Sequence, residues 1–358
     1  MSERAGNAAA SLENPSGEQR AGVRESGRSS AADDAKSPHD CGPAASPSGE
    51  LPVSHQEYLD KRRSELRGIA DKLSASREPE HLLGAAILGT DKSSSDRIAA
   101  LAAALDVDPH GPLTVWHLSR ACTNHSSARA CVRMDIEKRL LEADDVNGAH
   151  WAEIAVYREA QGDLAGALDA LANAGSASTY DSHWIESVMM LERSLAASTS
   201  YTHGKRVVEA FGIAASEAFL EADVLRACKR HAPDSEWWRI CLDFGGMLEQ
   251  KSGTVLGQAL GLGLQREMLE TSGSDASIAA VERRQAQFRR ELYDENPSHG
   301  VNFLVEYDVN SLSDYLAVFQ VYGEKAALEF ARSEAERLKS LPGYDPCLRR
   351  ASDVSSGD

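Results

Sequence analysis

The feature that most constrains the fold is an internal repeat marked by tryptophans. Trp116, Trp151 and Trp184 are separated by 35 and then 33 residues, and the second and third stand in the same local string, His-Trp-x-Glu. A recurring period of about 20–50 residues is typical of proteins that stack one small structural unit many times. Because each unit buries its apolar face only against its neighbours, the spacing predicts a stacked array.

The middle repeat has the pattern of two helices joined by a turn. Its first helix presents Trp151, Ile154 and Ala155 on one face. Gly162 supplies the left-handed stop that ends many helices, and Asp163 can cap the helix that follows. The second helix carries an apolar stripe with the spacing i, i+3, i+4, i+7, formed by Leu164, Ala167, Leu168, Leu171 and Ala174.

This middle repeat resembles the tetratricopeptide repeat (TPR). The large aromatic residue, turn glycine, small contact residue, bulky residue and second small residue of that pattern correspond to Trp151, Gly162, Ala167, Leu171 and Ala174. Packing explains the pattern, since two helices approach closely where a small residue faces a large ring. The flanking repeats depart from it. The resemblance therefore implies a TPR-like array of antiparallel helix pairs.

The composition also favours an all-α fold. Ala, Leu, Glu and Arg are abundant, only 6% of the residues are aromatic, and few runs alternate as a strand would. Gly253, Gly257 and Gly261 recur every four residues, which we interpret as a close helix–helix approach in the core. Helices are expected at 55–74, 78–89, 94–106, 254–271, 275–293, 311–321 and 324–339.

The chain divides into three segments by composition. Residues 1–52 are poor in large apolar side chains and rich in Ser, Ala, Gly and Pro, so we expect a disordered tail. Residues 53–342 form the expected helical-repeat domain, with the best repeat in 114–200, and a loose C-terminal tail is expected at 343–358. The layout of 112–200 is also similar to bacterial proteins with Ala-rich helix-turn-helix repeats. That resemblance implies a fold and carries no activity.

Charge and hydropathy exclude several classes of partner. The formal net charge of −17 opposes general nucleic-acid binding, because phosphate backbones repel an acidic protein. The longest apolar stretch, 255–264, contains Gln258 and is about half the length that a bilayer requires, so no membrane span is expected. The N-terminus lacks the apolar core of a signal peptide, which predicts a cytoplasmic protein. A periplasmic or exported protein with a misassigned start site is the alternative.

Four of the six cysteines form two pairs beside predicted turns. Cys122 and Cys131 flank one turn, and Cys228 and Cys241 flank another. A helical hairpin can bring such positions within disulfide distance. The missing signal peptide and the usual burial of cysteine favour free thiols, so both interpretations stay open. Each string also reads Cys-x-x-His followed by Cys, but three ligands fall short of the four in a structural zinc site.

No motif indicates catalysis, a cofactor or a metal. The chain lacks a GxSxG elbow, a Walker loop and an HExxH helix. His150 and His183 have no histidine partner at i+4, so they are expected at the surface or as caps. We expect a non-enzymatic interaction or scaffold protein that binds a protein or peptide in a helical groove. The alternatives are an all-α enzyme with a site in that groove and an exported, disulfide-stabilised helical protein.

Overall fold

The computed structural model confirms the all-α fold class. It describes residues 55–89, 93–123, 125, 128–216, 220–294, 300–302, 304–305 and 308–342. Within these ranges the chain is almost entirely helical, and the β-structure consists of two isolated bridges, Asn147–Thr179 and Tyr180–Ser252. The tails expected at 1–52 and 343–358 lie outside the described residues.

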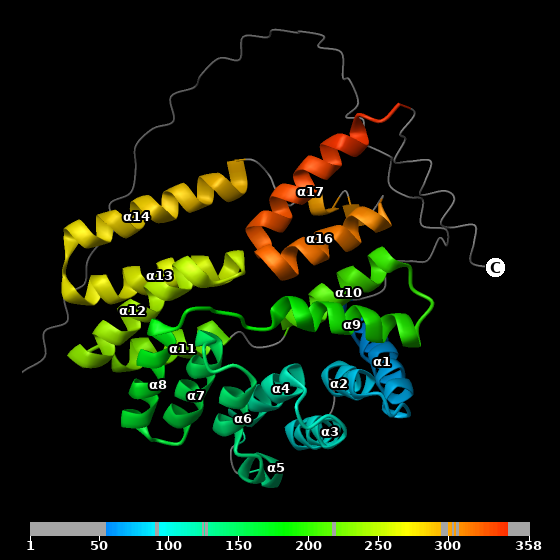
Figure 1. Ribbon diagram of the computed structural model, residues 1–358, viewed down its shortest axis with the longest axis horizontal. Coiled ribbons are helices and arrows are strands. Elements are labelled where there is room, and N and C mark those ends of the chain that lie inside the picture. The colour runs from blue at the N-terminus through cyan, green and yellow to red at the C-terminus, as the bar shows by residue number, and fades with distance from the viewer. Residues whose placement is uncertain are drawn as a thin grey trace, which may run out of the picture. The chain divides into compact units, whose positions relative to one another are not determined.

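Most of the helices follow one another with short connections, and a longer one joins α8 to α9 (Figure 1). In chain order they are α1 (His55–Ser74), α2 (Pro79–Leu88), α3 (Ser94–Val107), α4 (Pro112–Thr123), α5 (Arg129–Arg133), α6 (Ile136–Ala143), α7 (Gly148–Ala160), α8 (Leu164–Ser176), α9 (Trp184–Ser198), α10 (His203–Ser216), α11 (Leu220–His231), α12 (Ser235–Lys251), α13 (Val255–Ser272), α14 (Asp275–Arg289), the π-helical turn η1 (Arg290–Asp294), α16 (Val309–Tyr322) and α17 (Glu324–Lys339). The expected helix ranges agree with these bounds to within two residues, except that α14 ends early and continues into η1.

Most helices that are consecutive in the chain pack against each other. The most extensive contacts join α12 to α13, α7 to α8, and α16 to α17. Contacts between distant segments place α8 on α12, α11 on α7, and α9 on both α1 and α2. One large apolar core runs through most of these helices, and a smaller one lies between α13 and α14. The expected TPR-like stacking of these pairs stays a prediction.

The turn between α7 and α8 has the expected chemistry. Gly162 adopts the left-handed conformation, with φ of +82°, and the Asp163 side chain accepts a hydrogen bond from the Gly166 amide at 3.0 Å. The small and bulky positions of the repeat, Ala167, Leu171 and Ala174, are buried. No helix within the described ranges is long and apolar enough to span a bilayer.

The glycine series between α12 and α13 behaves only partly as expected. A Cβ on Gly261 would lie 2.6 Å from the Glu249 amide nitrogen and 2.7 Å from the Gly245 carbonyl oxygen, so these helices touch backbone to backbone. Gly257 instead faces the Ser252 side chain, and Gly253 precedes the helix. The predicted close approach between helices is therefore carried by Gly261.

This contact generates a test with a matched control. Gly261→Ala should lower the free energy of unfolding by about 1–3 kcal/mol, because the added methyl forces the two backbones apart. Gly263→Ala, in the same helix with open space at its Cβ, should raise it by about 0.5–1 kcal/mol. Urea unfolding followed by circular dichroism measures both. Equal effects of the two substitutions would show that α12 and α13 do not touch at Gly261.

Candidate functional site

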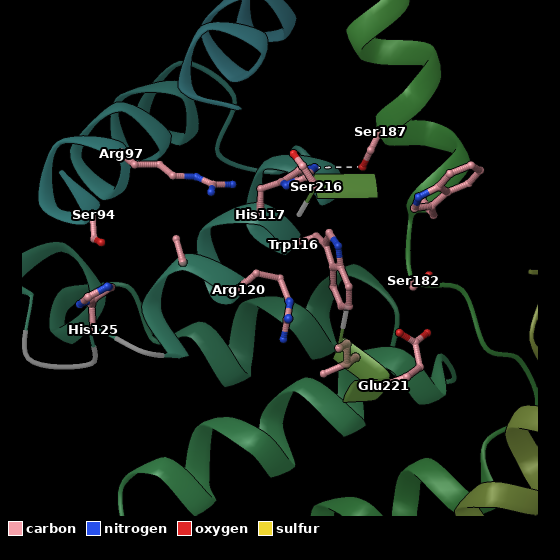
Figure 2. Close-up of a pocket in the computed structure, with 13 residues that line it drawn as sticks. Ser94, Arg97, Trp116, His117, Arg120, His125, Ser182, Ser187, Ser216 and Glu221 are labelled. Atoms are coloured by element: carbon pink, nitrogen blue, oxygen red, sulfur yellow. Dashed lines mark hydrogen bonds between the residues drawn. The ribbon is translucent and has the colours of Figure 1, made fainter. Parts of the chain in front are cut away.

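A pocket of about 250 Å³ lies where α3, α4, α9, α10 and α11 converge (Figure 2). We call it the α4–α9 pocket. It is lined by Ser94, Arg97, Trp116, His117, Arg120, Ala121, His125, Ser182, Trp184, Ser187, Ser216, Leu220 and Glu221. Side chains from segments more than 100 positions apart thus meet around one space, with two tryptophans and two arginines among them.

Arg120 forms the charged floor of the pocket. Its guanidinium donates to the carboxylate of Glu153 on α7 at 2.7 Å and to that of Asp223 on α11 at 2.8 Å. Glu153 is completely buried, and its second oxygen accepts a hydrogen bond from the Thr123 hydroxyl. Burial lowers the pKa of Arg120, but the two carboxylates more than offset this and raise it overall. The guanidinium is therefore permanently charged and tied to three helices.

A second buried pair borders the pocket through Glu221, which is one of its lining residues. The Tyr180 hydroxyl donates to the Glu221 carboxylate at 3.0 Å. Burial, followed by the charge of Glu221, raises the pKa of Tyr180, and burial raises the pKa of Glu221. The phenol therefore keeps its proton, and this pair acts as a packing contact between the α8–α9 connection and α11.

His117 and Ser187 form a pair of the types that serve as general base and nucleophile, but the hydrogen bond between them has the opposite direction to the one that catalysis needs. The Ser187 hydroxyl donates to the His183 carbonyl at 2.7 Å, so His117 Nε2 must donate to Ser187 at 3.0 Å (Figure 2). Burial, and then the positive charge of Arg97, lowers the pKa of His117 to about 3. A general base must accept the nucleophile's proton near neutral pH, and this imidazole is poorly suited to do so.

The two repeated histidines meet directly beside the pocket. His150 Nε2 lies 2.9 Å from His183 Nε2, and Trp116 stacks on His150 with ring centroids 5.8 Å apart. His150 is buried, so the expectation of a surface or capping histidine is wrong for this residue. His183 does stand at the N-cap of α9, in a left-handed conformation. Burial lowers the pKa of both rings, so both are neutral at pH 7.

The three repeated tryptophans occupy unlike environments. Trp116 is buried against both histidines, whereas Trp184 contacts Phe211 and Phe319 and is partly exposed. Trp151, the large ring expected to pack between the two helices of its repeat, is also partly exposed, and its indole N–H donates to the Asp145 carbonyl at 2.8 Å. That bond holds the ring at the edge of the core.

The structure contains both cysteine pairs as disulfides. Cys122–Cys131 and Cys228–Cys241 have Cα separations of 5.6 and 5.8 Å. Because each sulfur is bonded to the other cysteine of its pair, none of the four is available as a thiolate ligand for zinc in this state of the chain. The first bridge follows directly on Ala121, a lining residue of the pocket, and closes the loop that carries His125.

The charged groups of the pocket were not found from the sequence. Arg120, Glu153 and Asp223 stand in no recognisable motif, and 103 positions separate Arg120 from Asp223. No protein-family model, curated protein or solved structure matches this chain. The function is therefore inferred from the geometry of the site.

The buried neutral histidines predict a loss of stability in mild acid. His117 takes up a proton near pH 6.5 when unfolded, but only near pH 3 when folded. The unfolded chain thus binds more protons below pH 6.5, and stability falls as the pH drops through this window. At pH 5 this residue alone should cost about 2 kcal/mol relative to pH 7.5.

Urea unfolding at pH 7.5 and pH 5 checks this prediction. His117→Gln, which does not titrate, should lose less stability between the two pH values than the wild type does. The exposed His110→Gln is the matched control and should follow the wild type. If His117→Gln shows the wild-type pH dependence, His117 is not buried in its neutral form.

Proposed function

We propose that this chain is a non-enzymatic interaction protein whose α4–α9 pocket receives one anchoring side chain of a protein or peptide partner. The observation that carries the proposal is the make-up of the pocket. Trp116 and Trp184 line it together with Arg97 and Arg120, and tryptophan and arginine are the residue types that dominate binding energy at protein interfaces.

The size of the pocket supports a side chain over a free substrate. Sites for small molecules and cofactors usually measure about 300–1,000 Å³, and this pocket is about 250 Å³. Two of its charged side chains, Arg120 and Glu221, are already paired with groups of the protein behind the lining. Arg120 is bound to Glu153 and Asp223, and Glu221 accepts from Tyr180. A lining in which two tryptophans stand beside polar side chains held in place by the protein suits an anchor residue of a partner.

The alternative of an all-α enzyme receives less support. His117 and Ser187 are the nearest approach to a catalytic pair in the pocket, and their hydrogen bond has the wrong donor. We also infer that the helix pairs form a TPR-like array, since the α7–α8 unit has the turn glycine and small contact residues of that repeat. An array of this kind presents an extended surface on which a partner segment can lie.

Filling the pocket tests this proposal. Ala121→Trp places a bulky ring in the lining of the pocket, whereas Ala99→Trp places the same ring on the exposed side of α3. Affinity capture from the native host with mass spectrometry should recover a partner with the wild type and with Ala99→Trp, and lose it with Ala121→Trp. Circular dichroism must first show that all three proteins fold. Undiminished capture by Ala121→Trp would contradict the role of the pocket.

We also propose that the chain resides in an oxidising compartment, which is the exported alternative. The support is the two bridges, since disulfides are rare in cytosolic proteins. Each closes a short loop, with sequence separations of 9 and 13, and should stabilise the fold by about 3 kcal/mol in the chain-entropy model.

Thiol counting tests the compartment. Protein taken from its native host, denatured and reacted with a thiol reagent should show two free thiols of the six cysteines, at Cys41 and Cys347, which both lie outside the described residues. Six free thiols would place the chain in a reducing compartment. Peptide mapping should find Cys122 linked to Cys131 only, and a Cys122–Cys228 link would contradict the two local hairpins.

A further inference from the structure

Three ligand-type side chains gather at the N-terminus of α9. Asp181, His183 and Glu186 each place one ligand atom within 4.8 Å of the others. Of the three, Asp181 is exposed, and His183 and Glu186 are partly buried. None of them lines the α4–α9 pocket, although their chain neighbours Ser182 and Trp184 do. The cluster is therefore a separate constellation.

The hydrogen bonds of His150 determine which nitrogen of His183 is available. His150 Nδ1 lies 2.8 Å from the Leu140 carbonyl and 3.0 Å from the Asp144 carbonyl, so it must carry the proton. In the neutral ring Nε2 is then an acceptor, and His183 Nε2 must donate to it across 2.9 Å. His183 Nδ1 is left with a lone pair. Metal-binding histidines typically donate their other ring N–H to a fixed acceptor in this way.

Glu186 supplies a second, independent observation. Its Oε2 atom is fully buried and has no hydrogen-bond partner in the described part of the chain. Such an atom costs free energy unless a positive charge or a donor meets it. A cation bound between Glu186 and its two neighbours in the cluster would supply the positive charge that this oxygen lacks.

Helix capping explains only part of the cluster. The Asp181 carboxylate accepts the His183 amide at 2.8 Å through Oδ1, which is an ordinary role before a helix. It leaves the orphaned oxygen of Glu186 and the fixed tautomer of His183 unexplained. The N-terminus of α9 carries about half a positive charge, which disfavours a cation, but two carboxylates outweigh it.

We propose that Asp181, His183 and Glu186 bind one zinc ion, with His150 holding the His183 ring in place. One imidazole and two carboxylates are ligands that zinc accepts, and three protein ligands leave one position for water. This proposal departs from the expectation that the chain binds no metal. It goes beyond the proposed function, because it does not depend on a partner in the α4–α9 pocket.

Zinc titration of the full oxidised chain tests the site. Protein dialysed against EDTA and then transferred to buffer free of chelator is titrated with zinc chloride in competition with a chromophoric chelator. The wild type should bind one equivalent. Asp181→Asn and Glu186→Gln should each weaken binding by at least about tenfold. Glu270→Gln, an exposed carboxylate on α13, is the matched control and should bind as the wild type does.

Each outcome bears on the proposal. Asp181 is exposed, so Asp181→Asn should fold normally and remains informative if Glu186→Gln does not fold. Absence of zinc binding by the wild type, or equal binding by all variants, would overturn the site. Cobalt substitution provides a further check. A spectrum without thiolate-to-cobalt charge transfer is expected, and an intense band of that kind would place the metal on cysteine and overturn the assignment.

Discussion

One guanidinium, that of Arg120, holds together the helices around the α4–α9 pocket. It lies on α4, and its two carboxylate partners come from α7 and α11. A charge removed from water is costly unless it is paired and hydrogen-bonded, and here both carboxylates and the Thr123 hydroxyl contribute. Moving either helix away from α4 would leave a buried charge unpaired. The network thus fixes the relative positions of three helices that are distant in the chain.

Residues of this network could not be predicted from the sequence, whereas the helices could. Caps act within a few residues, so Gly162 and Asp163 indicate where α7 ends and α8 begins. The pairing of Arg120 with Asp223 depends on how α4 and α11 pack, and no local pattern records it. The two disulfides could be predicted in part from the sequence. Their partners flank single turns, so proximity was predictable, but oxidation depends on the compartment.

The repeated His-Trp string predicted the spacing of the repeat correctly but the wrong side chain in the core. The spacing of 33 residues does bring His150 and His183 into contact. Adjacent residues on a helix point about 100° apart, so only one residue of each His-Trp pair can point directly into the core. Carbonyls at the end of α6 accept from His150 and draw it inward, which leaves Trp151 at the edge. These carbonyl acceptors lie at the end of a neighbouring helix, and the pattern of apolar residues does not record them. A prediction from apolarity alone therefore turns the tryptophan, and not the histidine, into the core.

The junction between repeats is held by Asn147, the N-cap of α7. Its side-chain oxygen accepts from the Ala149 and Asp181 amides, each at 3.0 Å, and its amide group donates to the Asp181 carbonyl at 2.9 Å. His183, two positions after Asp181, has a φ of 55°, which is a strained conformation for a residue other than glycine. Such a conformation persists only where the surrounding structure holds it in place, and the bonds from Asn147 to Asp181 do so here. One cap therefore both starts α7 and fixes the turn into α9. The helices supply the apolar core, whereas the paired histidines and the cluster of Asp181, His183 and Glu186 stand at this junction. Their positions are fixed because Asn147 hydrogen-bonds the backbone both at the start of α7 and before α9.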